Sequence, residues 1–185
     1  IYWQNPGDSG LPPEIDWQIP VGFTVSDIDW PTPKVIRIPP LVNYGYEATT
    51  DLLQTLTIPA DAPTGQVQLR ASFGFLMWKD ICLPGEAELS YPLLIDTEPM
   101  SDKTLQTAFA NRHVPQPLPA DATLAITADD TYFYVQSTLQ IDHIIPGMEG
   151  TIDDFADQTI VDGFYRIAKD TWSEMDLERF TGILL

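Results

Sequence analysis

The segment with the clearest chemical potential surrounds the chain's single cysteine, Cys82, in the stretch Trp78–Pro84. A cysteine thiolate is the nucleophile of thiol–disulfide exchange, and its attack on a disulfide gives a mixed disulfide. Lys79 favours the thiolate and Asp80 opposes it. One thiol cannot resolve the mixed disulfide that it forms, so sustained turnover would need a thiol from another molecule. The alternative is a buried, inert cysteine, because free cysteine is among the most buried residue types.

Composition limits the classes of function. The 185 residues carry a net charge of −18, which excludes an electrostatic nucleic-acid binder and disfavours anionic lipid surfaces. A hydrophobic content of 44% is enough for a folded core. The 17 prolines exceed the 11 glycines, which favours short strands joined by rigid loops. No apolar run reaches the length of a membrane span, and no signal peptide opens the chain, so we expect a fragment of a longer protein.

Residues 66–78 and 86–95 alternate between apolar and polar side chains with the period of two that half-buried strands show. One face carries Val67, Leu69, Ala71, Phe73, Phe75 and Met77, and in the second segment Ala87, Leu89, Tyr91 and Leu93. Residues 79–85 are then the expected loop between these strands. Shorter strands are expected at 23–29, 35–38 and 49–58, separated by proline- and glycine-rich segments. Many short strands at this spacing predict an immunoglobulin-like antiparallel β-sandwich.

The pattern changes between residues 96 and 120. Ser101 is the expected N-cap of a short helix over 102–111, and Pro115, Pro117 and Pro119 form a stiff linker after it. Strands return at 122–127, 131–139, 159–169 and 180–185. The predicted fold is therefore all-β: an immunoglobulin-like sandwich over residues 1–97, followed by a linker helix and a second, smaller β domain over 98–185.

Two other patterns do not predict a site. Gly7–Gly10 (GDSG) imitates a serine-protease nucleophile motif, but both histidines, His113 and His143, lie far downstream, and in that fold the base precedes the serine. Metal-ligating side chains do not cluster at ligand spacing, and the acidic segment 153–162 lacks the calcium-loop pattern. We expect no metal and no cofactor.

Several segments together resemble the N-terminal periplasmic region of DsbD/ScsB-like thiol:disulfide interchange proteins, of the cytochrome c biogenesis and copper-sensitivity suppressor type. They are Tyr2–Pro13, Trp30–Lys34, Leu41–Glu47, Trp78–Pro84 and Gly85–Leu89. The resemblance covers most of residues 1–95 and continues more weakly through Gly150–Asp153 and Leu177–Leu184. The family motif reads Cys-Lys-Asp-Val/Ile-Cys-Ile/Leu-Pro, and Trp78 stands at its first cysteine.

The resemblance implies a periplasmic domain of a protein-disulfide reductase, tethered to the inner membrane in the full-length protein. Its implied partners are thioredoxin-like periplasmic domains and the transmembrane redox domain of the same protein. Cys82 is then the candidate exchange thiol, and the expected partner-binding residues are Trp78, Lys79, Asp80, Pro84, Tyr44, Tyr46 and Glu47. Two alternatives remain: a redox-silent module that only docks a partner through these loops, and a structural remnant in which Cys82 is buried.

Overall fold

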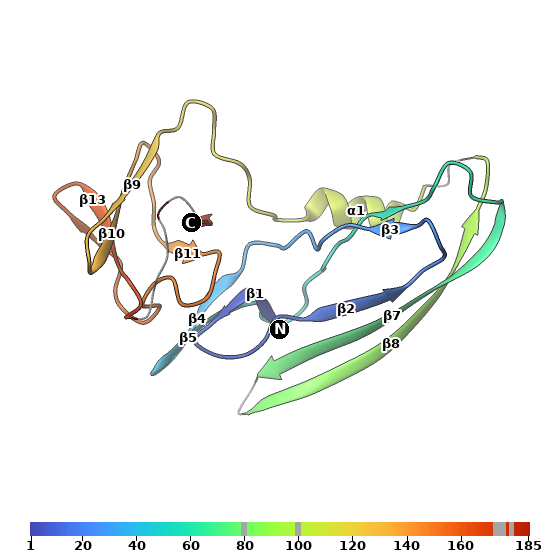
Figure 1. The fold of residues 1–185 in the computed structure, drawn as a ribbon, viewed down its shortest axis with the longest axis horizontal. Coiled ribbons are helices and arrows are strands. Elements are labelled where there is room, and N and C mark those ends of the chain that lie inside the picture. The colour runs from blue at the N-terminus through green and yellow to red at the C-terminus, as the bar shows by residue number, and fades with distance from the viewer. Residues whose placement is uncertain (79–80, 99–100, 172–176, 178–179) are drawn as a thin grey trace. The chain divides into compact units, whose positions relative to one another are not determined.

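The computed structural model describes residues 1–78, 81–98, 101–171, 177 and 180–185. In these residues the protein is built of short antiparallel strands and a single α-helix (Figure 1). The predicted class, an all-β chain with an immunoglobulin-like sandwich, further β structure after it and one short helix, is confirmed.

The chain forms two compact units that interleave in the sequence. Unit 1 contains Ile1, Pro13–Thr32 and Glu47–Val114, and unit 2 contains Tyr2–Pro12, Pro33–Tyr46 and Pro115–Leu185. The boundary between residues 97 and 98 that the sequence suggests stays a prediction about which segments fold independently.

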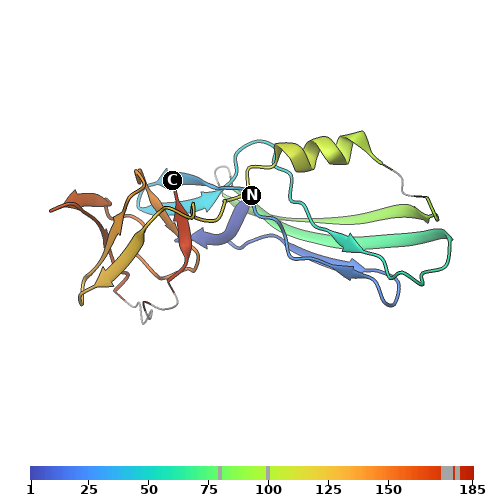
Figure 2. The same ribbon diagram turned by 90° about the horizontal axis from the view of Figure 1, so that it is seen from above.

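Unit 1 is organised around the sheet β2-β7-β8. Its strands are β2 (Glu14–Gln18), β7 (Gly65–Trp78) and β8 (Cys82–Ile95). Figures 1 and 2 both show β7 and β8 side by side along their length, and their register runs unbroken from Gly65↔Ile95 to Trp78↔Cys82. The short strands β3 (Thr24–Val25) and β6 (Leu56–Thr57) pair separately. Most of the strand expected at 49–58 is thus irregular.

The two faces of β7 differ as the alternation of its sequence predicts. Leu69 and Ala71 are buried on the apolar face, where the rings of Phe73 and Phe75 stack with centroids 4.9 Å apart. Residues on the opposite face, such as Arg70, point to solvent. The sheet therefore has one face directed to the core of unit 1 and one polar face.

The helix α1 (Lys103–Asn111) begins one residue later than expected. Its N-cap is Asp102 rather than Ser101, because the Asp102 Oδ1 accepts hydrogen bonds from the backbone N–H groups of Thr104 and Leu105 at 2.7 and 3.2 Å. A carboxylate in this position also interacts favourably with the helix dipole. Ser101 was the wrong cap by one position.

Unit 2 contains three antiparallel sheets. The first has the order β1-β5-β4, with β1 (Tyr2–Gly7), β5 (Leu41–Gly45) and β4 (Lys34–Ile38). The second has the order β12-β13-β10-β9, with β12 (Thr159–Val161), β13 (Phe164–Ala168), β10 (Tyr132–Ser137) and β9 (Leu124–Ala128). The third pairs β11 (Ile144–Pro146) with β14 (Gly182–Leu184).

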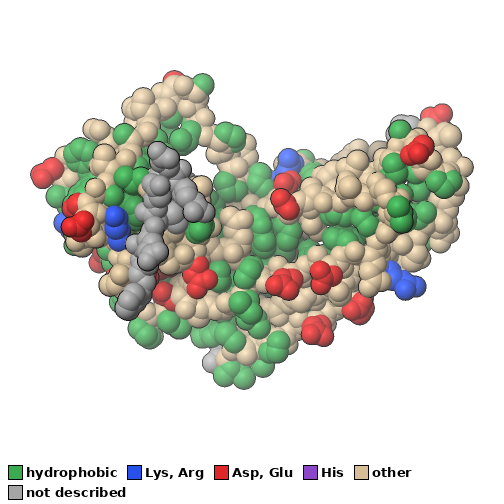
Figure 3. All heavy atoms as spheres, in the orientation of Figure 1, with side chains coloured by type: hydrophobic (Ala, Val, Ile, Leu, Met, Phe, Trp, Pro, Cys, Tyr) green, Lys and Arg blue, Asp and Glu red, His purple; other side chains and the backbone are tan. Residues whose placement is uncertain are grey.

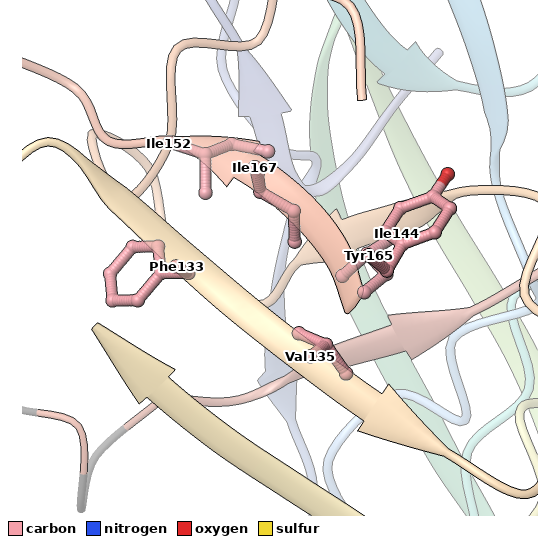
Figure 4. Packing of buried hydrophobic residues seen from close by; sticks show 6 residues of the cluster. All are labelled: Phe133, Val135, Ile144, Ile152, Tyr165 and Ile167. Atoms are coloured by element: carbon pink, nitrogen blue, oxygen red, sulfur yellow. The ribbon is translucent and has the colours of Figure 1, made fainter. Parts of the chain in front are cut away.

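The core of unit 2 comes from alternate residues of β10 and β13. Phe133 lies opposite Ile167 and Val135 opposite Tyr165, so these four side chains share one face of the sheet. Ile144 and Ile152 pack against them (Figure 4). Five of the six side chains are at most 2% exposed, and Tyr165 is 8% exposed while its hydroxyl donates to the Asp142 carbonyl at 2.6 Å.

The single strand expected over 159–169 is wrong. Asp162 and Gly163 have φ angles of 52° and 83°, and Val161 pairs with Phe164 across them. Two consecutive positive φ values are typical of the type I′ turn of a tight hairpin, for which Asp-Gly is a preferred sequence. The chain therefore reverses here, and the segment becomes two paired strands.

Candidate functional site

The β7–β8 hairpin presents the only cysteine. Cys82 is the first residue of β8, and its register partner in β7 is Trp78. Directly opposed residues of antiparallel strands point to the same face, with Cα atoms about 4.5–5.5 Å apart. The loop expected over 79–85 is shorter than predicted, because β8 begins at Cys82. Lys79 and Asp80 lie outside the described residues.

The end of this hairpin is apolar and exposed. We use "hairpin end" for Met77, Trp78, Ile81, Cys82 and Leu83. Trp78 and Met77 are 45% and 46% exposed, Ile81 is 63% exposed, and Cys82 is also exposed. The pair Trp78–Cys82 lies on the polar face of the sheet, whereas Met77 and Leu83 pair on the other face. The exposed thiol disagrees with the alternative of a buried, inert cysteine.

Pro84 shares this face with the cysteine. It pairs with Leu76, two residues along from Trp78, and it is exposed. The structure thus brings together three of the predicted site residues: Trp78, Cys82 and Pro84. Ile81 and Leu83 belong to the expected docking loop Trp78–Pro84 but were not named individually, and Met77 lies just outside it. The signal was present as a run of apolar residues around a predicted turn, where polar residues are usual.

The expected partner-binding segment Tyr44–Glu47 divides between the units. Tyr44, in β5, and Tyr46 belong to unit 2, while Glu47 belongs to unit 1 and is exposed. Tyr46 is half-buried, and burial raises the pKa of its hydroxyl. Tyr44 has no exposed surface, so any part that it takes in partner binding would be indirect.

Tyr44 forms a buried hydrogen bond with Asp154. Its hydroxyl donates to the Asp154 Oδ1 at 2.5 Å, and the carboxyl is only 7% exposed. Burial, and then the charge of Asp154, hold the pKa of Tyr44 far above its ordinary value, so the hydroxyl stays a donor. Burial also raises the pKa of Asp154 to about 6; the Tyr44 hydrogen bond opposes this rise, and the charges of Asp8, Asp153 and Asp170 add to it.

The segment Asn5–Ser9 is structural. The Asn43 Nδ2 donates to the carbonyls of Pro6 and Ser9 at 3.0 and 2.6 Å, and the Ser9 Oγ contacts the Asn43 Oδ1 at 3.3 Å. Gly7 has a φ of 81°, and an added Cβ would lie 2.4 Å from the Val42 carbonyl oxygen, so the close approach of β5 requires glycine. The Ser9 hydroxyl is thus held by the side chain of Asn43.

His143 lies near Gln158, with 3.5 Å between its Nε2 and the amide nitrogen. Burial, followed by the charge of Arg37, lowers the pKa of His143. Within the described parts of the chain, no group of three or more His, Cys, Asp or Glu side chains is placed to hold a metal ion. The hairpin end presents an exposed thiol opposite an exposed indole.

Residues 1–93 match the family described as thiol:disulfide interchange protein DsbD, N-terminal. The match covers half of the 185 residues and includes the whole β7–β8 hairpin end. The chain belongs to this family.

No curated protein and no solved structure matches the chain. As a member of the DsbD N-terminal family, the chain contains an N-terminal domain of a thiol:disulfide interchange protein, matched over residues 1–93. The part of the chain that the structure describes has no helix with the length and hydropathy of a membrane span.

Proposed function

We propose that this DsbD N-terminal domain docks thioredoxin-like partners in the periplasm through its hairpin end, with Cys82 as the exchange thiol. In the full-length protein, the proposed source of electrons is a transmembrane redox domain that also tethers it to the inner membrane. The observation that carries the proposal is the exposed pair Trp78–Cys82 at the end of β7 and β8.

The pair gives the domain a nucleophile and an anchor on one face. The Cys82 thiol loses its proton to solvent, and the resulting thiolate attacks one sulfur of the partner's disulfide and forms a mixed disulfide. The partner's other sulfur leaves as a thiolate. Trp78 supplies a large aromatic surface beside the bond, and aromatic side chains of this kind are common anchors of protein interfaces.

The reaction stops at the mixed disulfide in this chain. The second step needs a thiolate that attacks the Cys82 sulfur and returns the partner with both its sulfurs reduced. Trp78 stands where a cross-strand thiol would have to be, since it is the register partner of Cys82. A second thiol-bearing molecule must therefore complete the step, and we expect no sustained turnover by this domain alone.

The position of Trp78 also favours a second candidate, a redox-silent docking module. The two candidates differ in whether the complex depends on the sulfur atom. A binding titration with an oxidised thioredoxin-fold domain, with and without reducing agent, separates them when it is run on the wild type and on Cys82→Ser. A covalent complex that forms only with the wild type, and disappears with reducing agent, supports exchange. Equal, reversible affinity of both proteins supports the redox-silent module.

The role of the indole has its own control. Trp78→Ala should weaken binding about tenfold or more, as for a central aromatic anchor. Tyr91→Ala is the matched variant, because Tyr91 is 62% exposed on the same strand pair but lies on the opposite face, opposite Leu69. It should change the affinity less than about twofold. Equal effects of the two variants, or no binding by the wild type, would contradict docking through the hairpin end.

A further inference from the structure

The polar face of the sheet β2-β7-β8 carries four carboxylates behind the hairpin end. In β2, Glu14 lies opposite Gly74 and Asp16 opposite Ser72. In β8, Glu86 lies opposite the same Gly74 and Glu88 opposite the same Ser72. Opposed residues share a face, and residues two apart in a strand do as well. Glu14, Asp16, Glu86 and Glu88 therefore lie on one surface, and we call these four residues the acidic face. Cys82 lies on the same side of the sheet.

The spacing of the strands sets the size of the acidic face. Two residues along a strand span about 7 Å, and two steps between strands span about 10 Å. The four carboxylates thus form a rectangle of roughly these sides, centred on Gly74 and Ser72 of β7. An added Cβ at Gly74 would meet nothing within 4 Å, so the middle of the rectangle is open. Figure 3 shows acidic side chains gathered over these strands.

Within the described residues the acidic face keeps a net negative charge. All four residues are exposed, and none of them forms an ion pair within the residues that the structure describes. The nearest cation by register is Arg70, which lies in the next row of the same face, between Gln18 and Ser90. The sides of the rectangle are comparable to the Debye length of about 8 Å at physiological ionic strength, so the four charges act on an approaching molecule together.

We propose that this unpartnered face docks a protein whose contact surface joins an apolar patch, which receives Trp78, to a patch of lysine and arginine, which faces the four carboxylates. The inference rests on the proposed function, because it names the surface charge that the docked partner must carry. Complementary charge of this kind mainly accelerates association and selects among partners. Like-charge repulsion excludes a second copy of this chain, whose net charge is −18, as the occupant.

The test uses one thioredoxin-fold domain in two versions, with four surface residues around its active site changed either to lysine or to glutamate. The acidic-face variant carries Glu14→Gln, Asp16→Asn, Glu86→Gln and Glu88→Gln. A control variant carries Asp51→Asn, Asp61→Asn, Asp121→Asn and Glu149→Gln, four exposed positions outside this face. Both variants change the net charge by the same amount, from −18 to −14 (−18 + 4).

Association rates are measured by stopped flow at low and at physiological ionic strength. For the lysine version, we expect the acidic-face variant to associate about tenfold more slowly than the wild type at low salt, with a weaker salt dependence. The association rate of the control variant should be less than about twofold below that of the wild type. The glutamate version should associate slowly with all three proteins.

The outcomes separate this inference from the proposed function. An equal loss of rate in both variants overturns the inference. An association rate of the acidic-face variant equal to that of the wild type also overturns the inference. The proposed function survives in that case if Trp78→Ala still weakens binding. Charge-dependent association that is insensitive to Trp78→Ala and to Cys82→Ser overturns docking through the hairpin end, and with it the inference that the partner's apolar patch receives Trp78. A wild type that binds neither version overturns both.

Discussion

Replacing Asp154 by asparagine should stabilise unit 2 at neutral pH and have much less effect in acid. The Asp154 carboxyl is 7% exposed and accepts a hydrogen bond from the Tyr44 hydroxyl at 2.5 Å. The side-chain amide of the variant Asp154→Asn would keep a carbonyl oxygen for this bond but would never ionise. The substitution therefore isolates the cost of placing a negative charge at this position.

The magnitude follows from the pKa of Asp154. Burial, the largest cause, and the charges of Asp8, Asp153 and Asp170 together raise it from 3.8 to about 6 against the opposing hydrogen bond from Tyr44. A shift of about two units at about 1.4 kcal/mol each corresponds to about 3 kcal/mol for the whole titration. Between pH 4.5 and 7.5 the contribution of Asp154 to the free energy of unfolding changes by about 2 kcal/mol. It changes by less than the whole amount because the carboxyl of the unfolded chain is already mostly ionised at pH 4.5.

Asp154 is a group whose pKa is higher in the folded state than in the unfolded state, and this sets the direction in which stability changes with pH. Folded Asp154 binds its proton more tightly than the unfolded chain does, so its contribution to stability is fully present below about pH 4 and is lost as the pH rises through about 6. The free energy of unfolding of Asp154→Asn minus that of the wild type should therefore increase by about 2 kcal/mol from pH 4.5 to 7.5. Any fixed cost of the amide is the same at both pH values and cancels.

The assay is a urea titration at both pH values, followed by NMR signals of Phe133 and Ile167 in the core of unit 2. The matched control is Asp157→Asn, which replaces an exposed side chain in the same loop and should change the free energy of unfolding by no more than about 0.5 kcal/mol. A difference between Asp154→Asn and the wild type that is constant with pH, or that falls as the pH rises, would refute the reasoning. It would show that ionised Asp154 is well solvated or paired.

Two further predictions test the hairpin register and the core. Trp78→Cys should form a disulfide with Cys82 on mild oxidation, because opposed residues have Cα atoms within disulfide range. The disulfide is measured as the loss of both titratable thiols. Met77→Cys, on the other face, should keep both thiols, and the reverse result would show a different register. Ile167→Ala should lower the free energy of unfolding by about 2–5 kcal/mol, measured by urea titration. Ile160→Ala, in the same sheet but 71% exposed, should cost below about 1 kcal/mol, and equal costs would contradict the assigned core.

Periodicity predicted the strands of the β7–β8 hairpin but misplaced its turn. The alternation from Val67 to Met77 indicated the correct strand and its buried face, because one face of such a strand must be covered. Residues 82–85, part of the loop expected over 79–85, instead begin β8 and include Pro84 and Gly85. Both are tolerated in β8 because it is an edge strand, paired only with β7 in the described sheet. Edge position is not visible in a local sequence window.

The errors in the C-terminal half have local causes. The turn at Asp162-Gly163 carried its own signal, an Asp-Gly pair between β-branched and aromatic residues, and could have been predicted. The short strand β11 could not, since its three residues, Ile144–Pro146, show no periodicity. It is a strand because it pairs with β14, which lies inside the strand expected at 180–185, 38 residues away at Ile145↔Ile183.

The sequence by itself determined the chemistry that this domain lacks and the charge that it carries. A single cysteine cannot by itself resolve a mixed disulfide, and a net charge of −18 disfavours polyanionic partners, whatever the fold. Only the tertiary structure decided which residues act together. Strand pairing places Trp78 opposite Cys82 and brings Glu14 into one row with Glu86, and packing buries Tyr44 against Asp154. The register between strands that are distant in the sequence determines these pairs, because a slip of one residue would turn each side chain to the other face. The composition of a local segment does not specify that register.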